Sequence, residues 1–393
     1  MLKQILAVTT MNLRTLPQRS AASAVSIIGI AGVVLIVVAV LSIREGFRKT
    51  LELGGSERVA IVLRGSSTSE MNSSFSSEQV QIIEQAPGIA KDAHGPIASA
   101  ELYTTVDQPK RSTGTAANAP LRGIETPGVQ TREHFKLLSG RLFASGHYEV
   151  IVGRGAAQTL SGLDVGRTVK WGTTEWRVVG MFADGGSVAE SEIWTDARVL
   201  QSAYSRGDSF QTVRVKLESP TSLGVFKAQL TSDPRLSVNV LTERAFYAAQ
   251  SALIGNLVRG AGSVLALLMG VGAVFGALNT MYSAVATRTR EIATLRALGF
   301  GGLPVAVSVV TEALLLGLLG GVLGAAIAYL AFDGFQTSTL NYSSFSQVSF
   351  AFAVTPALIA SGTAYALLLG LIGGVFPAIK AARQSVIVGL REA

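Results

Sequence analysis

The chain has 393 residues, of which 48% are hydrophobic and only 15% are charged. Soluble domains contain about 25% charged residues. Here the deficit is concentrated in four uncharged blocks, so the composition predicts a membrane protein rather than an unusually apolar soluble one. The absence of cysteine excludes disulfide bonds, cysteine-based metal sites and cysteine catalysis. The net charge of +7 includes short basic groups beside the uncharged blocks, where they set membrane orientation, so we expect no nucleic-acid partner.

Residues 1–19 are predicted to form an amphipathic helix on the cytoplasmic side of the membrane, in the interface. Its apolar face would consist of Leu2, Ile5, Leu6, Leu13 and Leu16. Pro17 would end or bend this helix. A plain basic flank for the following span explains the segment equally well. Residues 20–43 contain no charge, which predicts the first transmembrane helix.

Residues 44–259 have the composition of a large folded domain of the α+β class. Short apolar segments typical of strands are Val59–Leu63, Glu149–Gly153, Trp176–Gly180 and Thr212–Leu217. Helical segments alternate with them, so we expect two lobes, one built from about residues 60–135 and the other from the parts around it. Residues 243–257 have a helical pattern and continue without a strong breaker into the next uncharged block, which predicts helical stalks.

Three further spans are predicted at residues 260–287, 305–330 and 356–376, each long and apolar enough to cross the bilayer. A charged segment at 288–300 separates the first two of these spans. A periplasmic loop at 331–355 separates the last two, and a cytoplasmic tail follows at 377–393. The predicted fold class is a membrane protein with four transmembrane α-helices and a large α+β domain between the first and the second.

Basic residues gather on one side of the spans. That side holds Lys3, Arg14, Arg19, Arg288, Arg290, Arg296, Lys380, Arg383 and Arg391. The loop at 331–355 has neither lysine nor arginine. By the positive-inside rule, both termini and the segment at 288–300 are cytoplasmic, and the large domain is periplasmic or extracellular. We expect a multi-pass protein of the bacterial inner (plasma) membrane, in contact with membrane lipid.

Glycines in the spans recur at a spacing of four residues. The pairs are Gly272 with Gly276, Gly317 with Gly321, Gly320 with Gly324, and Gly370 with Gly374. Small residues at this spacing let helix backbones approach closely. We therefore expect helix packing at these positions, within the subunit or across a dimer.

The sequence contains no recognisable motif for catalysis or nucleotide binding. The patterns G-x-x-x-x-G-K-[ST], G-x-S-x-G and H-E-x-x-H do not occur. His94, His134 and His147 lie far apart and do not have the spacing of metal ligands. We expect a non-catalytic subunit with no metal site and no directly bound cofactor.

The segment from Arg288 to Gly299 reads R-T-R-E-I-A-T-L-R-A-L-G, and the span that follows it carries an early acid, Glu312. The large domain contains, in order, the segments Ser139–Phe143, Glu149–Gly153, Leu163–Gly166 and Trp176–Gly180, and the tail contains Phe376–Arg383. This ordered set, on four spans, resembles the permease subunits of the MacB/FtsX superfamily of ABC transporters, also called type VII, with a MacB-type periplasmic core domain.

The resemblance implies that the segment at 288–300 is a coupling helix. It would dock on a cytoplasmic ABC ATPase on a separate chain, and that partner would bind ATP and Mg²⁺. The implied docking residues are Arg288, Arg290, Glu291, Ile292, Leu295, Arg296, Leu298 and Gly299. The charged members suit ion-paired contacts and the apolar ones lie at helical spacing. The alternative is a basic segment that only sets topology.

Glu312 is the single charged residue of the third span. An acid inside a membrane is costly, so we expect it to cap a helix or to pair with basic residues near the cytoplasmic face. A proton relay is the alternative.

For the whole protein, the resemblance implies a dimer that transmits ATP hydrolysis mechanically to its outer domains. The dimer would consist of identical chains or of two related permeases. The leading hypothesis is export with a periplasmic adaptor protein. Release of lipoproteins to a carrier is the alternative, and a membrane receptor without a transport role is a third interpretation.

Overall fold

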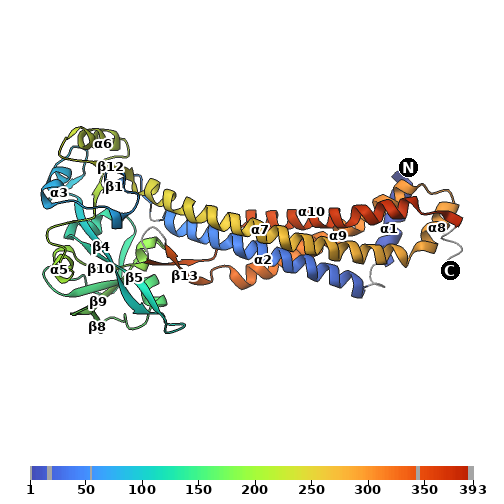
Figure 1. Cartoon of the computed structure of the whole chain (residues 1–393), viewed down its shortest axis with the longest axis horizontal. Coiled ribbons are helices and arrows are strands. Elements are labelled where there is room, and N and C mark those ends of the chain that lie inside the picture. Colours follow the sequence, from blue (N-terminus) through green and yellow to red (C-terminus); the bar gives the residue numbers. More distant parts are fainter. Residues whose placement is uncertain (1, 16–19, 54, 342–345, 388–393) are drawn as a thin grey trace. The chain divides into compact units, whose positions relative to one another are not determined.

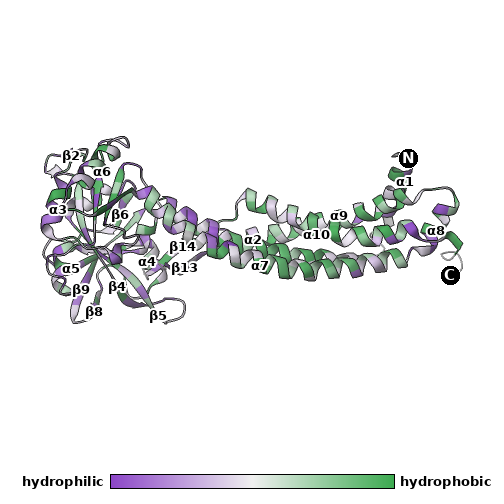
Figure 2. Cartoon of the chain, turned by 45° about the horizontal axis from the view of Figure 1, so that its top comes forward, coloured by the Kyte–Doolittle hydropathy of each residue, from purple (hydrophilic) through white to green (hydrophobic). Residues whose placement is uncertain are grey.

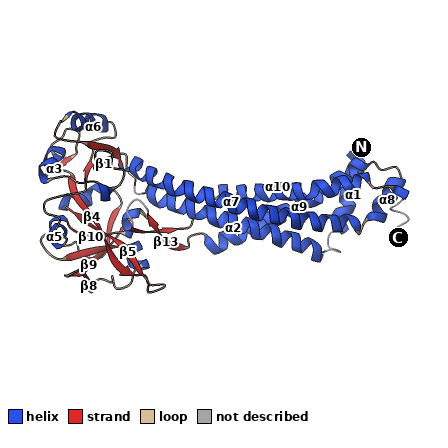
Figure 3. Cartoon of the chain, viewed as in Figure 1, coloured by secondary structure: helices blue, strands red, loops and turns tan. Residues whose placement is uncertain are grey.

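The computed structural model describes residues 2–15, 20–53, 55–341 and 346–387. The expectations for Leu16, Pro17, Arg19 and Arg391 therefore fall outside the described residues. The chain divides into a helical unit, Met1–Glu45, Asn256–Phe335 and Phe352–Ala393, and a sheet unit, Gly46–Gly255 and Gln336–Ala351. Figure 1 follows the chain through both units, and Figure 3 separates helices from strands.

The helical unit is built from six helices or parts of helices. They are α1 (Leu2–Thr15), α2 (Ser20–Leu53), α7 (Glu243–Ala286), α8 (Thr289–Ala297), α9 (Gly302–Phe332) and α10 (Pro356–Arg383). Four of them, α2, α7, α9 and α10, are long and apolar enough to cross a membrane, and hydrophobic residues dominate along them in Figure 2. The predicted fold class is confirmed, and α2 and α7 each continue from one unit into the other.

Helix α10 extends beyond the expected end of the fourth span. It continues from Phe376 through Pro377 to Arg383. A proline inside a helix removes one backbone hydrogen bond. The added turns bury Ala378 and Ala381 against α8 and α9, and this packing compensates for the lost bond.

Glycines set the contacts between the long helices. A Cβ atom at Gly370 would lie 2.7 Å from the carbonyl oxygen of Ala313, and one at Gly317 would lie 2.9 Å from that of Ala366. Gly320, Gly321, Gly324 and Gly374 have similarly close neighbours on other helices. In contrast, a Cβ atom at Gly272 or Gly276 would meet nothing within 4 Å among the described residues. Close packing within the chain therefore involves α2, α9 and α10, and leaves this face of α7 uncovered.

The main sheet of the sheet unit has ten described strands, in the order β12-β1-β11-β4-β5-β10-β7-β9-β6, with β8 paired to β9. The strands are β1 (Val59–Arg64), β4 (Ala98–Pro109), β5 (Ala116–Ile124), β6 (Phe135–Gly140), β7 (Glu149–Gly153), β8 (Thr168–Trp171), β9 (Thr174–Asp184), β10 (Ile193–Asp196), β11 (Thr212–Lys216) and β12 (Val238–Thr242). Pairs β5–β10 and β7–β9 are parallel, and the others are antiparallel. All four predicted strand segments correspond to these strands, and only Leu217 falls beyond the end of its strand, β11.

Short helical elements connect the strands. They are α3 (Ser77–Glu84), α4 (Arg154–Thr159), α5 (Ala197–Ala203), α6 (Ser222–Ser232) and the single turns η2 (Glu70–Asn72), η3 (Thr126–Thr131) and η4 (Val188–Ser191). A two-residue pair, β2 (Lys91–Asp92) and β3 (Gly95–Pro96), precedes β4. Helix α3 begins at a capping box made by Ser76 and Gln79, which satisfies two free backbone N–H groups.

The two largest hydrophobic cores along the sheet divide the chain differently from the predicted lobes. One core draws on residues 60–100 and 197–240, and the other on residues 102–204. The expected lobe of residues 60–135 is wrong because β11 returns to pair with β1, with Val213 opposite Val62. Strand β4 serves both cores, with Ala100 in the first and Leu102 in the second.

A buried ion network lies between these cores. The Arg122 guanidinium bonds the carboxylates of Glu70 at 2.8 Å, Glu101 at 2.9 Å and Glu192 at 2.8 Å. Arg132 donates to the same Glu101, with 3.0 Å between Nη2 and Oε2. Buried charges are tolerated only when they are paired and hydrogen-bonded, and this network joins η2, β4, β5 and the residue before β10.

The connection between α9 and α10, expected as a loop, contains a β-hairpin. Its strands are β13 (Gln336–Asn341) and β14 (Ser346–Ala351). The hairpin packs within the sheet unit: the Ser349 N–H donates to Ser191 Oγ at 2.9 Å, and Tyr103 Oη lies 2.7 Å from Ser346 Oγ. A polar segment with few apolar residues gives a weak strand signal, so only its contacts with the sheet unit reveal its structure.

We predict that the ion network makes the sheet unit sensitive to acid. Burial alone would raise the pKa of Glu101, but the Arg132 and Arg122 guanidinium groups lower it from 4.5 to about 2. Since the unfolded chain binds the proton first, this carboxylate stabilises the fold fully above about pH 4.5, and the stabilisation is lost as pH falls towards 2. Stability should fall in this window, with Glu101 contributing at most about 1.4 kcal/mol per pH unit.

Tryptophan fluorescence measures this prediction, because Trp171, Trp176 and Trp194 all lie in the sheet unit. The Glu101→Gln variant should have a lower Tm at pH 7 and a flatter dependence of Tm on pH between 4.5 and 2. The matched control is Glu175→Gln, at an exposed position of the same unit. An unchanged pH profile in Glu101→Gln would show that this carboxylate is not the titrating group.

Candidate functional site: helix α8 and the polar cluster behind it

Helix α8 is a short helix with a well-defined end. Gly299 has a φ of +93°, which an L side chain rarely adopts. The Phe300 N–H donates to the Leu295 carbonyl at 3.1 Å, and the Gly299 N–H donates to that of Arg296 at 3.1 Å. This pair of bonds is a Schellman motif, which satisfies carbonyl groups at the end of the helix. Gly299 therefore acts as the helix terminator, and its place in the predicted docking set is explained by the turn.

Three of the predicted docking residues face the chain itself. Ile292 is 5% exposed and packs in a cluster with residues of α7, α9 and α10. Arg296 donates to the carbonyl oxygens of Ala382 and Gln384 at 2.8 and 2.7 Å. Arg288 is 7% exposed. These side chains fix α8 against its own helical unit, and their role as contacts for a partner stays a prediction.

The outer face of α8 consists of the remaining residues. Arg290, Glu291 and Thr294 are exposed, and Leu298 is 72% exposed. Leu295 is half-buried at the edge between the two faces. The exposed face therefore presents both signs of charge and one large apolar side chain, which suits a polar rim around an apolar contact.

A polar cluster lies behind α8 and joins it to α1 and α9. Arg288 Nη1 lies 3.6 Å from Glu312 Oε2, and it also donates to Asn12 Oδ1. Asn12 Nδ2 donates to Glu312 Oε2 at 2.8 Å and to Ser308 Oγ at 2.9 Å. Arg288 Nε completes the cluster with a bond to Glu291 at 3.1 Å. The expectation that Glu312 pairs with a basic residue is confirmed, and the partner is Arg288.

Asn12 and Ser308 are the members of this cluster that the sequence did not identify as site residues, and Asn12 is the central one. It is 1% exposed although it sits in a short amphipathic helix. Its amide offers an acceptor to the arginine and donors to the acid and to the serine hydroxyl, so one side chain bridges both charges. A single asparagine in such a helix carries no signal of burial, because the partners are about 300 residues away in the sequence.

We predict strong energetic coupling between Arg288 and Glu312. The Glu312→Leu variant leaves a buried arginine without its counter-ion, which costs about 3–5 kcal/mol of stability. Adding Arg288→Met should recover most of that loss, because the second change removes the unpaired charge. Thermal unfolding in detergent, followed by size-exclusion chromatography or circular dichroism, measures both variants.

The matched control for the Glu312 and Arg288 variants is Asp164→Leu. This change removes an exposed ion pair with Arg111 in the sheet unit. Exposed pairs contribute about 0–1 kcal/mol, so this control should change little. Purely additive losses in the double variant would contradict the coupling.

Comparison with known proteins places this architecture in a family. The MacB-like periplasmic core domain matches residues 23–233, and the FtsX-like permease C-terminal domain matches residues 263–386. A macrolide export ATP-binding/permease protein, MacB, of Pasteurella multocida is 27% identical over 306 residues, covering 73% of this chain and 45% of the relative. An uncharacterised ABC transporter permease of Methanocaldococcus jannaschii is 23% identical over 325 residues, covering 81% of this chain and 79% of the relative.

The chain spans less than half of the length of the MacB relative. Among solved structures, the periplasmic region of MacB from Actinobacillus actinomycetemcomitans is 12% identical with a TM-score of 0.38, covering 50% of this chain and 94% of that one. Since the first family match alone covers more than half of the chain, and the two together run from the first long helix to the last, the chain belongs to the MacB/FtsX-like family of ABC transporter permeases.

Proposed function

We propose that this permease transmits the ATP-driven motion of a cytoplasmic ATPase to its sheet unit outside the membrane, and that this motion drives export. The ATPase is a separate chain that binds ATP and Mg²⁺, and the permease acts as a dimer. Both termini and α8 are cytoplasmic in this proposal, because the basic residues gather at that end of the spans.

The length and the end contacts of helix α7 are the main support for this proposal. It is one uninterrupted helix of 44 residues, about 66 Å long at 1.5 Å per residue, whereas about 20 residues cross a bilayer. Its first residue, Glu243, is buried and pairs with Arg214 of β11. Its last residue, Ala286, lies two residues before Arg288 of the polar cluster. A helix fixed at both ends is suited to carry displacement from α8 to the sheet unit.

The hairpin β13–β14 supplies a second connection. It is continuous in sequence with α9 and α10, yet it belongs to the sheet unit. Asn341 bonds Gln250 of α7 at 3.0 Å, and Phe350 stacks edge-on with Phe47 of α2 at 5.7 Å. The third and fourth spans therefore have their own route to the sheet unit beside α2 and α7.

We predict that Leu298→Glu prevents the ATPase from binding. Leu298 is the large apolar side chain of the outer face of α8, and a carboxylate there would be desolvated on docking. The amount of ATPase that co-purifies with the tagged permease should fall at least about tenfold. The matched control is Val225→Glu, at a 61% exposed position of the sheet unit, which should leave binding unchanged. Failure of any ATPase to bind the unaltered chain would favour the receptor interpretation.

We predict that the dimer forms through the glycine face of α7. A Cβ atom at Gly272 or Gly276 would meet nothing within 4 Å among the described residues, and close helix approach needs such small residues. The chain has no cysteine, so Gly276→Cys should form an oxidised dimer in membranes without background. Leu319→Cys, at a 47% exposed position of α9, is the matched control. Cross-linking in the control but not at Gly276 would place the dimer contact elsewhere.

Export is the leading assignment because several relatives are named for it. Besides the MacB relative, a pyoverdine export ATP-binding/permease protein, PvdT, of Pseudomonas entomophila is 27% identical over 256 residues, covering 61% of this chain and 37% of the relative. Release of lipoproteins to a carrier is the alternative. A gene for a periplasmic adaptor beside the permease gene supports export, whereas a gene for a lipoprotein carrier supports the alternative.

A further inference from the structure

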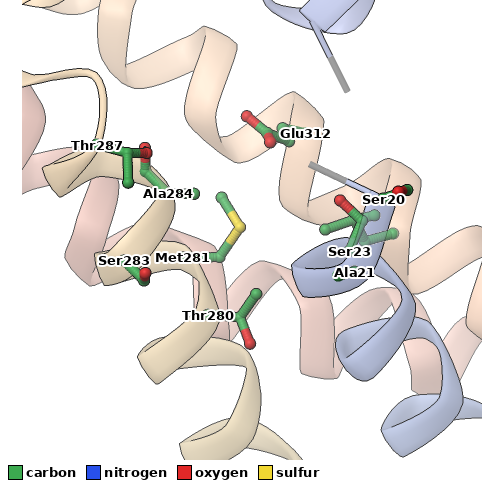
Figure 4. Close-up of a pocket in the computed structure, with 10 residues that line it drawn as sticks. Ser20, Ala21, Ser23, Thr280, Met281, Ser283, Ala284, Thr287 and Glu312 are labelled. Carbon is green, nitrogen blue, oxygen red and sulfur yellow. The ribbon is translucent and has the colours of Figure 1, made fainter. Parts of the chain in front are cut away.

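A cavity of about 350 Å³ opens between α2, α7 and α9 of the helical unit. Figure 4 shows its walls, with serine side chains from the first turn of α2, hydroxyl side chains from the last turns of α7, and Glu312 from α9. The five hydroxyl residues are Ser20, Ser23, Thr280, Ser283 and Thr287. Cavities of this size hold small ligands or headgroups, and none of the described residues that line this one is aromatic.

Glu312 presents an uncommitted oxygen to this cavity. Its contacts with Asn12 and Arg288 both fall on Oε2, so Oε1 has no hydrogen-bond partner among the described residues. The side chain is only 4% exposed. A carboxylate oxygen without a partner gains from a hydrogen-bond donor, so the cavity offers a place for a donor group.

The hydroxyl groups on the α7 wall are also arranged to accept. Thr280 Oγ1 donates to the Gly276 carbonyl at 2.9 Å, and Thr287 Oγ1 donates to the Ala284 carbonyl at 3.0 Å. Since a hydroxyl has one proton and two lone pairs, these groups have already used their protons and retain acceptor capacity. The walls thus combine a carboxylate oxygen with hydroxyl acceptors. A primary ammonium, which has three N–H donors, complements this set, whereas a trimethylammonium has none.

The contacts of Glu312 also place the cavity near the membrane surface. Asn12 belongs to α1, an amphipathic helix of the kind that lies in the interface plane, and it contacts both Ser308 and Glu312. Ser20 and Ser23 lie in the first turn of α2. The cavity therefore opens at the end of the spans, at the level where lipid headgroups lie.

We propose that this cavity binds the primary ammonium group of an amphiphile, with the ammonium at Glu312 Oε1 and the hydroxyl groups of α7. Two sources share this chemistry: an ethanolamine phospholipid of the bilayer and an amphiphilic amine of another kind. The proposal does not depend on the transport function or on the ATPase, because every contact it uses lies within the helical unit.

The test uses the full chain in detergent and native mass spectrometry with defined lipids. The probes are phosphatidylethanolamine, its mono- and dimethyl derivatives, and phosphatidylcholine with the same acyl chains. The fraction of permease that retains a bound lipid should fall as each methyl group replaces an N–H donor of the headgroup. We expect about fivefold to tenfold preference for the ethanolamine lipid over the choline lipid. Equal retention of all four probes would overturn the proposal.

A variant pair tests the location. Ser283→Phe adds a bulky side chain to the cavity wall at an exposed position, so folding should be preserved while the preference for ethanolamine is lost. Ser263→Phe, at an exposed position of α7 away from the cavity, should retain it. Preserved preference in Ser283→Phe would show that the ammonium binds elsewhere and would overturn the proposal.

The amphiphile that co-purifies from native membranes distinguishes the two sources. If the bound molecule is an ethanolamine phospholipid or another primary amine, it should be lost in Ser283→Phe and retained in Ser263→Phe. This result would support the site and identify its occupant. A bound lipid without an amine, lost in the same way, would overturn the assignment.

Discussion

The buried contact between Arg288 and Glu312 holds together the end of the helical unit at which α8 lies. Each charge alone would be costly in an apolar setting, so neither side chain can leave the other without penalty. Asn12 bonds both of them, which adds α1 to the same assembly. Helix α8 is therefore attached to α9 and α1 by directional contacts, and a force on its outer face acts on all three helices together.

The sheet unit is also held together by buried ion pairs between arginine and glutamate side chains. Arg122 holds three carboxylates from elements that are distant in sequence, and Arg132 shares one of them. Hydrophobic packing is non-directional, whereas bidentate arginine–carboxylate pairs fix geometry. Arg122 and Arg132 thereby hold η2, β4, β5 and the residue before β10 in a defined orientation.

The structure divides the residues of α8 between two faces, which the sequence pattern does not distinguish. The pattern of charged and apolar residues at helical spacing is the same whether they face a partner or the chain itself. Ile292 and Arg288 serve the interior, while Leu298 and Arg290 remain on the outer face. One short helix thus has an anchored face and an exposed face, and the polar cluster connects the anchored face to the cavity at Glu312.

The sequence by itself determined the four spans, the strand segments around Val59, Glu149, Trp176 and Thr212, and the need of Glu312 for a basic partner. These features follow from local hydrophobicity, β-propensity and the cost of an isolated charge in a membrane. Only the tertiary structure decided which base pairs with Glu312, why Asn12 is buried, which face of α8 is free, and that the last loop forms a hairpin on the sheet unit. Those outcomes depend on contacts between residues up to about 300 positions apart, and local patterns hold no information about such partners.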